Sequence, residues 1–420
     1  MKTMVIKGGR LIDGHGGAPV QDSVLILEGE RIVAVRTAAE TKIPGGDDVT
    51  LMDATGKTVM PGLIDGHIHI YMDGESTGFF ELPIHNNSID MAMKAIPRLR
   101  RTLEMGFTTV RDGGSGYSWF EVSLREAIKR GDIVGPRYLT SGYHLTVTGG
   151  HGYFLPHWLG RFEPPEQLGM HCDGVDAWRK GARLNLYNGT DNIKVVASRG
   201  FASLALRGAG PPTCAQATVE EMQAAVSEAH KMGRKAMAHA NGPEAVKNAV
   251  RAGVDSIVHG LHVDEEAVRM IVNAIVVLEP TNICFRPDRY EGTGIEPPQP
   301  GSKQHAMKTR TIEEFHMILE KGVTISCGSD ASVPYLRNGD NARELAACVD
   351  LGMTPMEAIV SATKTAATTL GLGDKVGTIE KGKLADILIV DGDPLADIGV
   401  LTREACIACV IKNGEIAIHR

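Results

Sequence analysis

The stretch GLIDGHIHI, residues 62–70, determines how the rest of the chain is interpreted. Its length and aliphatic residues are typical of a buried strand, but two histidines, His67 and His69, occupy positions where a core would be packed. Residues two apart in a strand face the same side, so both imidazoles are expected on one face. A metal ion is the simplest partner for such a pair, although the pattern H-x-H also arises by chance.

Seven further β-like runs follow this stretch, and helical patterns separate them, for example at 89–105, 219–232 and 243–252. The motif TVEE, which begins at Thr218, is a start signal for the second of these helices. Alternating β and α segments predict an α/β fold with a parallel sheet, and eight such units predict a (β/α)8 TIM barrel. The eight runs are residues 62–70, 107–114, 137–145, 192–200, 235–240, 255–260, 274–283 and 323–331.

An open, doubly wound sheet is the alternative arrangement of the same runs. Such a sheet usually carries a glycine-rich dinucleotide-binding motif near its start. The nearest match, GLGDKVG at residues 371–377, has the wrong spacing and follows a helical pattern. The barrel is therefore the favoured prediction.

The two ends of the chain have the same sequence pattern, in which short apolar runs are separated by turns that contain glycine. LEGER and KNGEI, near the two ends, have the composition of hairpin turns. We therefore expect both termini to build one small β-domain, a composite β-sandwich, beside the catalytic barrel. The predicted domains are residues 1–60 plus 372–420 for the β-domain and 61–371 for the metal-binding barrel.

The composition limits the class of partner. The 420 residues carry a formal charge of −7, with no clustered positive face of the kind that binds nucleic acid or an anionic membrane. The start of the sequence lacks the apolar run of a signal peptide, and no window approaches the length of a membrane span. Together with seven scattered cysteines, these features predict a cytoplasmic protein that binds neither nucleic acid nor membrane.

Only the motif CIAC, residues 406–409, has the cysteine spacing of a redox or zinc site. It lacks a second pair and lies in a β-like stretch. We therefore expect Cys406 and Cys409 to be buried strand residues.

Four other runs end in polar side chains where aliphatic ones would suffice: Lys194, His239, His259 and Asp330. Each has an ordinary explanation when taken alone, such as a snorkelling lysine, a hydrogen-bonded core histidine or a helix-capping aspartate. Together with His67 and His69, however, these four residues place side chains that can bind a metal at the C-terminal ends of five predicted strands. In a barrel these ends converge on one mouth, which is where barrel active sites lie.

The motifs that carry these residues resemble the metal-dependent amidohydrolase superfamily, which combines a barrel with a composite β-domain. DGHIHI, NIKVVAS, MAHAN, IVHG and CGSDA carry the likeness. The longer segments MPGLIDGHIH, FTTVRDGG, GVDSIVHG and GTIEKGKLADILIV follow in matching order, so the resemblance extends from end to end.

This resemblance implies a binuclear zinc centre. His67, His69 and Asp330 would hold one ion, His239 and His259 would hold the second, and Lys194 would bridge both as a carbamate. A hydroxide that bridges the metals would attack the substrate carbonyl, with Asp330 acting as general base and then as general acid. The implied activity is hydrolysis of a C–N amide bond in a small molecule.

Within the superfamily, the likeness is to the prolidase-like and imidazolonepropionase-like branch, whose members hydrolyse dipeptides and N-acylated amino acids. In the motif SGYHLTVTGGHG, the resemblance implies that His144 and His151, in the loop after strand three, polarise the scissile carbonyl or hold the substrate. For His151, an equally open interpretation is that it only orders its glycine-rich loop. Relatives often form homo-oligomers, so we expect one here.

Two positions depart from the branch. Arg199 replaces a glycine after the lysine motif, and Ala217 replaces a common aromatic residue. Arg199 either binds a substrate carboxylate or points to solvent. Because both positions would contact substrate, an amidase acting on bulkier amides, carbamates or ureas is the alternative function.

Two other classes are less well supported. A mononuclear deaminase of the superfamily would carry a glutamate where this chain has Gly242, and a non-catalytic scaffold would be expected to have lost ligands. Two long segments, 143–174 and 281–310, exceed ordinary βα connections and are expected to act as lids or specificity loops. For the second segment, a plain surface insertion is an equally open interpretation.

Overall fold

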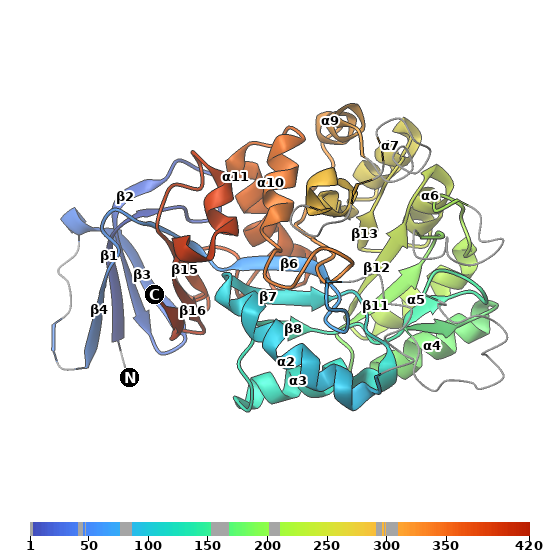
Figure 1. The fold of residues 1–420 in the computed structure, drawn as a ribbon, viewed down its shortest axis with the longest axis horizontal. Helices are drawn as coiled ribbons and strands as arrows, with labels where there is room; N and C mark the ends of the chain where they lie inside the picture. The colour runs from blue at the N-terminus through green and yellow to red at the C-terminus, as the bar shows by residue number, and fades with distance from the viewer. Residues whose placement is uncertain are drawn as a thin grey trace.

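The computed structural model describes residues 3–40, 45–46, 48–75, 86–152, 168–200, 211–290, 296–297, 299 and 310–420. Figure 1 shows strands from the two ends of the chain, in blue and red, side by side at one end of the molecule. Parallel strands and their flanking helices occupy the rest.

Strands from both termini join in one eight-stranded sheet, in the order β17-β16-β15-β5-β1-β2-β3, with β4 pairing with β1. The two turns predicted from LEGER and KNGEI connect antiparallel neighbours, β2 with β3 and β16 with β17. The strands are β1 (Thr3–Leu11), β2 (Val20–Glu28), β3 (Arg31–Thr37), β4 (Val49–Asp53), β5 (Thr58–Pro61), β15 (Ile387–Val390), β16 (Ile407–Lys412) and β17 (Glu415–His419).

The middle of the chain contains two parallel sheets, as the α/β prediction requires. One has the order β6-β7-β8 and the other the order β10-β9-β11-β12-β13-β14. From β11 to β14 the strands follow chain order, without the reversal of a doubly wound sheet. The strands are β6 (Leu63–Ile68), β7 (Phe107–Asp112), β8 (Arg137–Leu139), β9 (His144–Thr146), β10 (Gly169–His171), β11 (Asn192–Val196), β12 (Lys235–Ala240), β13 (Ser256–His259) and β14 (Val277–Glu279).

Two of the predicted runs differ from the structure. Residues 137–145 form two short strands, β8 and β9, because the chain turns between them at Gly142, whose φ is +70°. The eighth run, 323–331, makes only isolated parallel bridges, from Ile325 to Leu278 and from Ala331 to Ile68. It cannot stay extended to its end, since Asp330 has a left-handed φ of 60°.

The helices lie between the strands, and the three predicted from periodicity begin and end within one residue of their expected limits. The second begins with a capping box, in which the Thr218 hydroxyl accepts from the Glu221 amide and the Glu221 carboxylate accepts from the Thr218 amide. The helices are α2 (Ser88–Glu104), α3 (Phe120–Arg130), α4 (Val175–Tyr187), α5 (Val219–Lys231), α6 (Pro243–Arg251), α7 (Glu265–Asn273), α9 (Ile312–Glu320), α10 (Arg343–Asp350), α11 (Pro355–Val360) and α12 (Ala366–Thr369). None of these described helices combines the length and apolar character needed to traverse a bilayer.

The two long segments lie only partly within the described residues. The first contributes β9 and the unpredicted short strand β10, while residues 153–167 fall outside the described part. The second begins with two 3₁₀ turns, η6 (Asn282–Phe285) and η7 (Pro287–Tyr290), and most of the remainder falls outside. Their expected roles as lids or specificity loops therefore stay predictions.

All seven cysteines are free thiols. Cys409 is buried in β16, as expected, but Cys406 is only partly buried and lies in a 3₁₀ turn, η10 (Glu404–Cys406), before that strand begins. The prediction for Cys406 is wrong because the strand starts one residue later, at Ile407.

Candidate metal centre

The first group of predicted ligands lies where β6 meets the segment that carries Asp330. The backbone of the two segments is joined by hydrogen bonds from the Asp330 amide to the His67 carbonyl (2.7 Å) and from the His69 amide to the Ala331 carbonyl (2.8 Å). As a result, Oδ1 of Asp330 lies 3.2 Å from Nε2 of His67 and 3.4 Å from Nε2 of His69. The strand alternation that suggested a shared face thus brings both imidazoles to one carboxylate.

The second group comes from neighbouring strands of the larger sheet. His239 and His259 stand near the ends of β12 and β13, which are paired in parallel, and their ring centroids are 4.7 Å apart. Lys194 lies in the middle of the adjacent strand β11 and is 2% exposed. Ligand atoms of His67, His259 and Asp330 all lie within 4.8 Å of one another, so the two groups meet.

Hydrogen bonds fix the orientation of three of the imidazoles. Nδ1 of His69 lies 3.0 Å from the Gly114 carbonyl, and Nδ1 of His259 lies 2.8 Å from the Thr281 hydroxyl. Nε2 of His239 lies 3.0 Å from the Arg199 carbonyl. When one ring nitrogen donates to an oxygen, the other is left as the lone-pair nitrogen that a metal ion requires.

The glycines of the DGG motif make room for these rings. A Cβ on Gly113 would overlap the His67 ring and lie 2.6 Å from its Nδ1. A Cβ on Gly114, which has a φ of +110°, would lie 2.8 Å from Nε2 of His144. Both positions exclude a larger residue because the backbone directly after β7 passes against the imidazoles.

Burial keeps the imidazoles in the form that binds metals. The pKa of His69 is lowered to about 3 by desolvation, with the charge of Lys194 contributing next. Desolvation also lowers the pKa of His67, His239 and His259 well below the ordinary value, and Lys194 contributes to each. Neutral imidazoles at physiological pH are ready ligands, because no proton must first be removed.

Lys194 and Asp330 are shifted in opposite directions. Burial lowers the pKa of Lys194 to about 7, while the carboxylate of Asp330 opposes the shift. Burial raises the pKa of Asp330 to about 7, while the Lys194 ammonium opposes it. An acid with a pKa near neutrality suits proton transfer in both directions, and an amine with a pKa near neutrality is partly unprotonated and therefore nucleophilic.

The donor set fits a divalent cation such as zinc. Nδ1 of His67 and Oδ1 of Asp330 are buried and make no hydrogen bond with any described residue. Buried polar atoms normally have partners, so two such atoms in one cluster indicate that something else satisfies them. Imidazole nitrogen and carboxylate oxygen are ligands that zinc commonly takes.

Sequence analysis missed two carboxylates that support this cluster. Asp65 accepts hydrogen bonds from the amides of His67 (2.9 Å) and Ser329 (3.0 Å). Asp112 accepts from the amides of Ile70 (3.0 Å), which follows His69 in the chain, and Gly114 (2.8 Å), whose carbonyl contacts the His69 ring. Both are fully buried acids in strands, and an aspartate within a predicted buried strand is the sequence signal that could have drawn attention to them.

The residues expected to contact substrate border the ligands. His144 is the first residue of β9, not part of a loop, and its ring lies 5.6 Å from that of His69. The ring of His151 stacks on that of His239 at 4.3 Å, and its backbone amide is held by Gln216 at 3.0 Å. The guanidinium of Arg199 is partly buried and donates to the carbonyl of Gly149 in the same loop. His144 therefore borders the first group, and His151 and Arg199 border the second.

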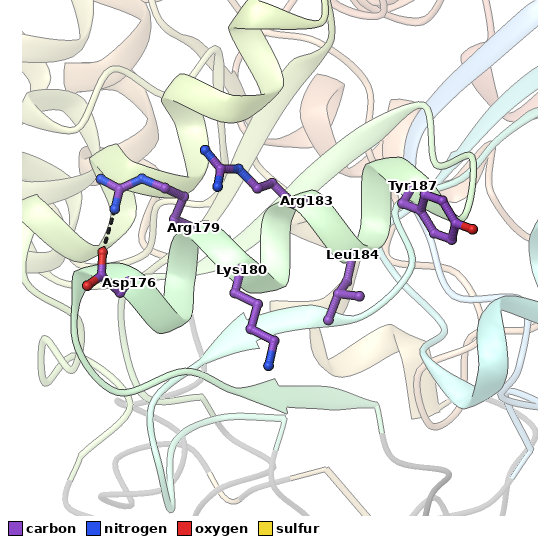
Figure 2. Close-up of a pocket in the computed structure, with 6 residues that line it drawn as sticks. All are labelled: Asp176, Arg179, Lys180, Arg183, Leu184 and Tyr187. Carbon is purple, nitrogen blue, oxygen red and sulfur yellow. Dashed lines mark hydrogen bonds and ion pairs between the residues drawn. The ribbon is translucent and has the colours of Figure 1, made fainter.

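A separate hollow lies on the surface of α4. It is lined by Asp176, Arg179, Lys180, Arg183, Leu184 and Tyr187. Figure 2 shows that these side chains all project from this one helix and that Arg179 pairs with Asp176. None of the lining residues belongs to the cluster of imidazoles and carboxylates, and Tyr187 is 88% exposed. The hollow faces solvent and is separate from the candidate metal centre.

Comparison with known proteins agrees with this geometry. Residues 58–417 match the model of the amidohydrolase family. The chain belongs to the amidohydrolase family. A crystal structure of a prolidase complexed with N-methylphosphonate-L-proline is 31% identical, with a TM-score of 0.85 and full coverage of both chains. Ochratoxinase of Aspergillus niger is 29% identical over 437 residues, which cover 99% of this chain and 86% of the relative.

A third relative carries the second name that was used above for this branch. Imidazolonepropionase of Symbiobacterium thermophilum is 25% identical over 463 residues, which cover 99% of this chain and 97% of the relative. This amidohydrolase is therefore a metal-dependent enzyme that hydrolyses amide C–N bonds, and it fits the prolidase-like branch of the superfamily.

Proposed function

We propose that this amidohydrolase holds two zinc ions and hydrolyses the amide bond of a dipeptide or an N-acylated amino acid. The observation that carries the proposal is the convergence of His67, His259 and Asp330, whose ligand atoms lie within 4.8 Å of one another. Zinc with nitrogen and oxygen ligands and an open position is the usual arrangement of a hydrolytic metal site.

The proposed ligand sets follow the two groups of side chains. His67, His69 and Asp330 would hold one ion, and His239 and His259 would hold the other. Lys194 would be the ligand shared by both as a carbamate, which forms when its neutral amine adds to carbon dioxide and loses a proton. A lysine pKa of about 7 supports this step, because a large share of the side chain is then unprotonated at neutral pH.

The zinc pair would supply Lewis acidity, polarising the substrate carbonyl and lowering the pKa of a water molecule. Asp330 takes the proton that the attacking water loses and passes it to the nitrogen of the departing amine. Its pKa of about 7 supports both transfers. His144, whose ring lies 5.6 Å from that of His69, orients the substrate carbonyl.

The proposed architecture is a closed (β/α)8 barrel around this centre. Hydrogen bonds support closure: the Asn192 amide donates to Thr140 between the two parallel sheets, and the Gly66 amide donates to Cys327. Buried Arg111, on β7, also donates to the Gly66 carbonyl and pairs with Glu279 on β14. Strands of both sheets therefore face a common interior.

The proposed domains are 1–60 plus 372–420 and 61–371. One apolar cluster supports the small domain, because it contains residues from both ends of the chain. Its members include Ile6, Leu25 and Val59 from the first part and Ile387 and Ile411 from the second. A core that mixes the two termini is expected if they fold as one unit.

The substrate class rests on the relatives and on the residues around the second ligand group. The likeness to a prolidase bound to a proline phosphonate favours a dipeptide or an N-acylated amino acid. Arg199 and Ala217 depart from the branch, and the likeness to a protein named ochratoxinase favours the alternative of a bulkier amide. Hydrolysis of carbamates or ureas belongs to the same alternative.

A substrate panel tests the proposal. Zinc-loaded protein is assayed against dipeptides, N-acyl amino acids, aryl amides and carbamates, with chelator-treated protein as the control. We expect hydrolysis of members of the first two classes, loss with the chelator and recovery when zinc is restored. Turnover confined to non-amino-acid amides would replace the substrate class with the alternative, and no turnover of any amide would contradict the proposed function.

A further inference from the structure

A short loop follows β14 and reaches both groups of proposed ligands. It begins at Thr281, which is fully buried and has a left-handed φ of 49°, and continues through the 3₁₀ turn η6 to Cys284. A β-branched residue rarely adopts this conformation, so the surrounding structure must hold it there. Unusual backbone at such a position is a reason to ask what the loop does.

Thr281 contacts His259, a proposed ligand of the second group. Its hydroxyl oxygen lies 2.8 Å from Nδ1 of His259. If Nε2 of His259 binds a cation, Nδ1 carries the ring proton and donates it to the hydroxyl. The hydroxyl then fixes both the tautomer and the rotation of the ring, which is the usual role of an outer partner of a ligating histidine.

Cys284 contacts Asp330, a proposed ligand of the first group. Its sulfur lies 3.7 Å from Oδ2 of Asp330 and 3.4 Å from the carbonyl of Ser329. The thiol is a weak donor that can bond to either oxygen. Because Oδ2 faces the thiol, Oδ1 is the oxygen that faces the imidazoles of His67 and His69, at 3.2 and 3.4 Å. The two oxygens of the Asp330 carboxylate therefore face different groups: Oδ2 faces a thiol, and Oδ1 faces two imidazoles.

The loop is held from outside by a buried acid. The carboxylate of Glu344, on α10, accepts hydrogen bonds from the backbone amides of Asn282 (2.9 Å) and Ile283 (2.8 Å). Glu344 has no exposed surface, and the Asn282 side-chain amide adds a contact to Cys348 on the same helix. The loop is therefore fixed between α10 and the ligands, and its side chains have little freedom to rotate.

We infer that the loop from Thr281 to Cys284 positions His259 and Asp330 and so sets the geometry of the metal centre. Thr281 and Cys284 act as positioning residues, because each acts through a ligand rather than on the substrate. The inference rests on the proposed function, since it concerns the same site. It adds that two ligands from different strands are oriented by one loop, whose placement depends on Glu344.

Cobalt binding provides a test that does not depend on turnover. Cobalt(II) replaces zinc in many such sites, and its visible absorption reports on the geometry of the ligands. We expect Thr281→Val to weaken cobalt binding about 10- to 100-fold, as loss of an outer partner usually does, and Thr281→Ser to restore it. Cys284→Ala is expected to alter the cobalt spectrum and to lower kcat about tenfold with little change in KM, and Cys284→Ser to recover most of both.

Two variants serve as matched controls. Thr102→Val removes a buried hydroxyl that bonds the Arg98 carbonyl in α2, and Cys409→Ala removes a buried thiol from β16. Neither contacts the centre, so both should bind cobalt as the unmodified protein does. Circular dichroism verifies that each variant is folded. If Thr281→Val does not fold, the comparison of Cys284→Ala with Cys284→Ser tests the inference.

The outcomes separate this inference from the proposed function. If the unmodified protein binds cobalt and both alterations leave affinity, spectrum and kcat unchanged, the positioning role is wrong and the metal centre stands. If the serine variants are as defective as the valine and alanine variants, packing rather than hydrogen bonding is responsible and the inference also fails. If the unmodified protein binds no cobalt, the proposed function and the inference fall together.

Discussion

The side-chain amide of Asn341 donates a hydrogen bond of 2.7 Å to the carboxylate of Asp65, although 276 residues separate them along the chain. The same carboxylate accepts from the amide of His67 and from the backbone and hydroxyl of Ser329. Asp65 thus joins the strand that carries His67 to the segment that carries Asp330. A buried carboxylate tolerates its desolvation only when it accepts such bonds, so all of these partners are needed.

Replacing Asn341 by alanine should therefore weaken both the fold and the metal centre. Loss of a hydrogen bond to a buried charge costs about 1–3 kcal/mol, because the carboxylate keeps its partners His67 and Ser329 but loses one bond that offsets its desolvation. Urea unfolding of the metal-free protein measures the loss, and zinc titration measures the affinity. Asn188→Ala, which removes a bond to the Leu184 carbonyl at the end of α4, is the control. Equal stability and affinity for both variants would contradict the role given to Asn341.

A methyl group at Gly113 should disturb metal binding more than folding. The added Cβ would overlap the His67 ring, so the imidazole must rotate away from Asp330. We expect Gly113→Ala to lower zinc affinity at least about tenfold, since ligand orientation sets affinity. Gly17→Ala, at a position with open space around it, should have no effect. Equilibrium dialysis with zinc compares the two, and normal affinity in the Gly113 variant would show that the ring is not held as described.

Asparagine in place of Asp330 should separate metal binding from turnover. The amide keeps an oxygen that can face the imidazoles but cannot accept and return a proton, so kcat should fall about 10²- to 10⁴-fold. Zinc content should remain close to that of the unmodified protein, measured by atomic emission. Asp374→Asn, at an exposed position, is the control. Near-normal turnover in the Asp330 variant would contradict its role in proton transfer.

Glu121 should make the protein less stable as pH rises. It is fully buried, and desolvation, followed by the charge of Asp112, raises its pKa to about 8 from an ordinary value of 4.5. Between these values the unfolded chain has lost the proton and the folded chain has kept it, so rising pH favours unfolding. The free energy of unfolding is expected to fall by roughly 1.4 kcal/mol per pH unit between these two values, and the loss is complete above pH 8.

Glu121→Gln removes this dependence, because the amide does not titrate. The variant should therefore gain stability relative to the unmodified protein at pH 8 but not at pH 4. Urea unfolding of the metal-free proteins at both pH values measures the difference, with Glu320→Gln on the exposed end of α9 as the control. A difference independent of pH would mean that Glu121 is ionised in the folded state.

The sequence alone predicted those features that depend on a regular repeat of residues or on a local capping motif. The two-residue repeat of a strand placed His67 and His69 on one side, and capping chemistry fixed the start of α5 at Thr218. The sequence did not predict interactions between residues that are far apart in the chain and follow no repeat. Asp65 with Asn341 is one such contact.

Irregular backbone was also beyond prediction. No periodicity foretells that Thr281 adopts a left-handed conformation and reaches His259, or that β10 forms from three residues. Asp330 itself was found because parallel strands end at one edge, but its φ of 60° and the loss of a regular eighth strand came only with the structure.

Anomalous X-ray scattering at the zinc edge, from crystals of the zinc-loaded protein, tests the metal centre most directly. We expect two peaks, one among His67, His69 and Asp330 and one beside His239 and His259, with continuous electron density from Nζ of Lys194 to both. Zinc found only at surface histidines, or an unmodified Lys194 that contacts neither peak, would contradict the proposed centre.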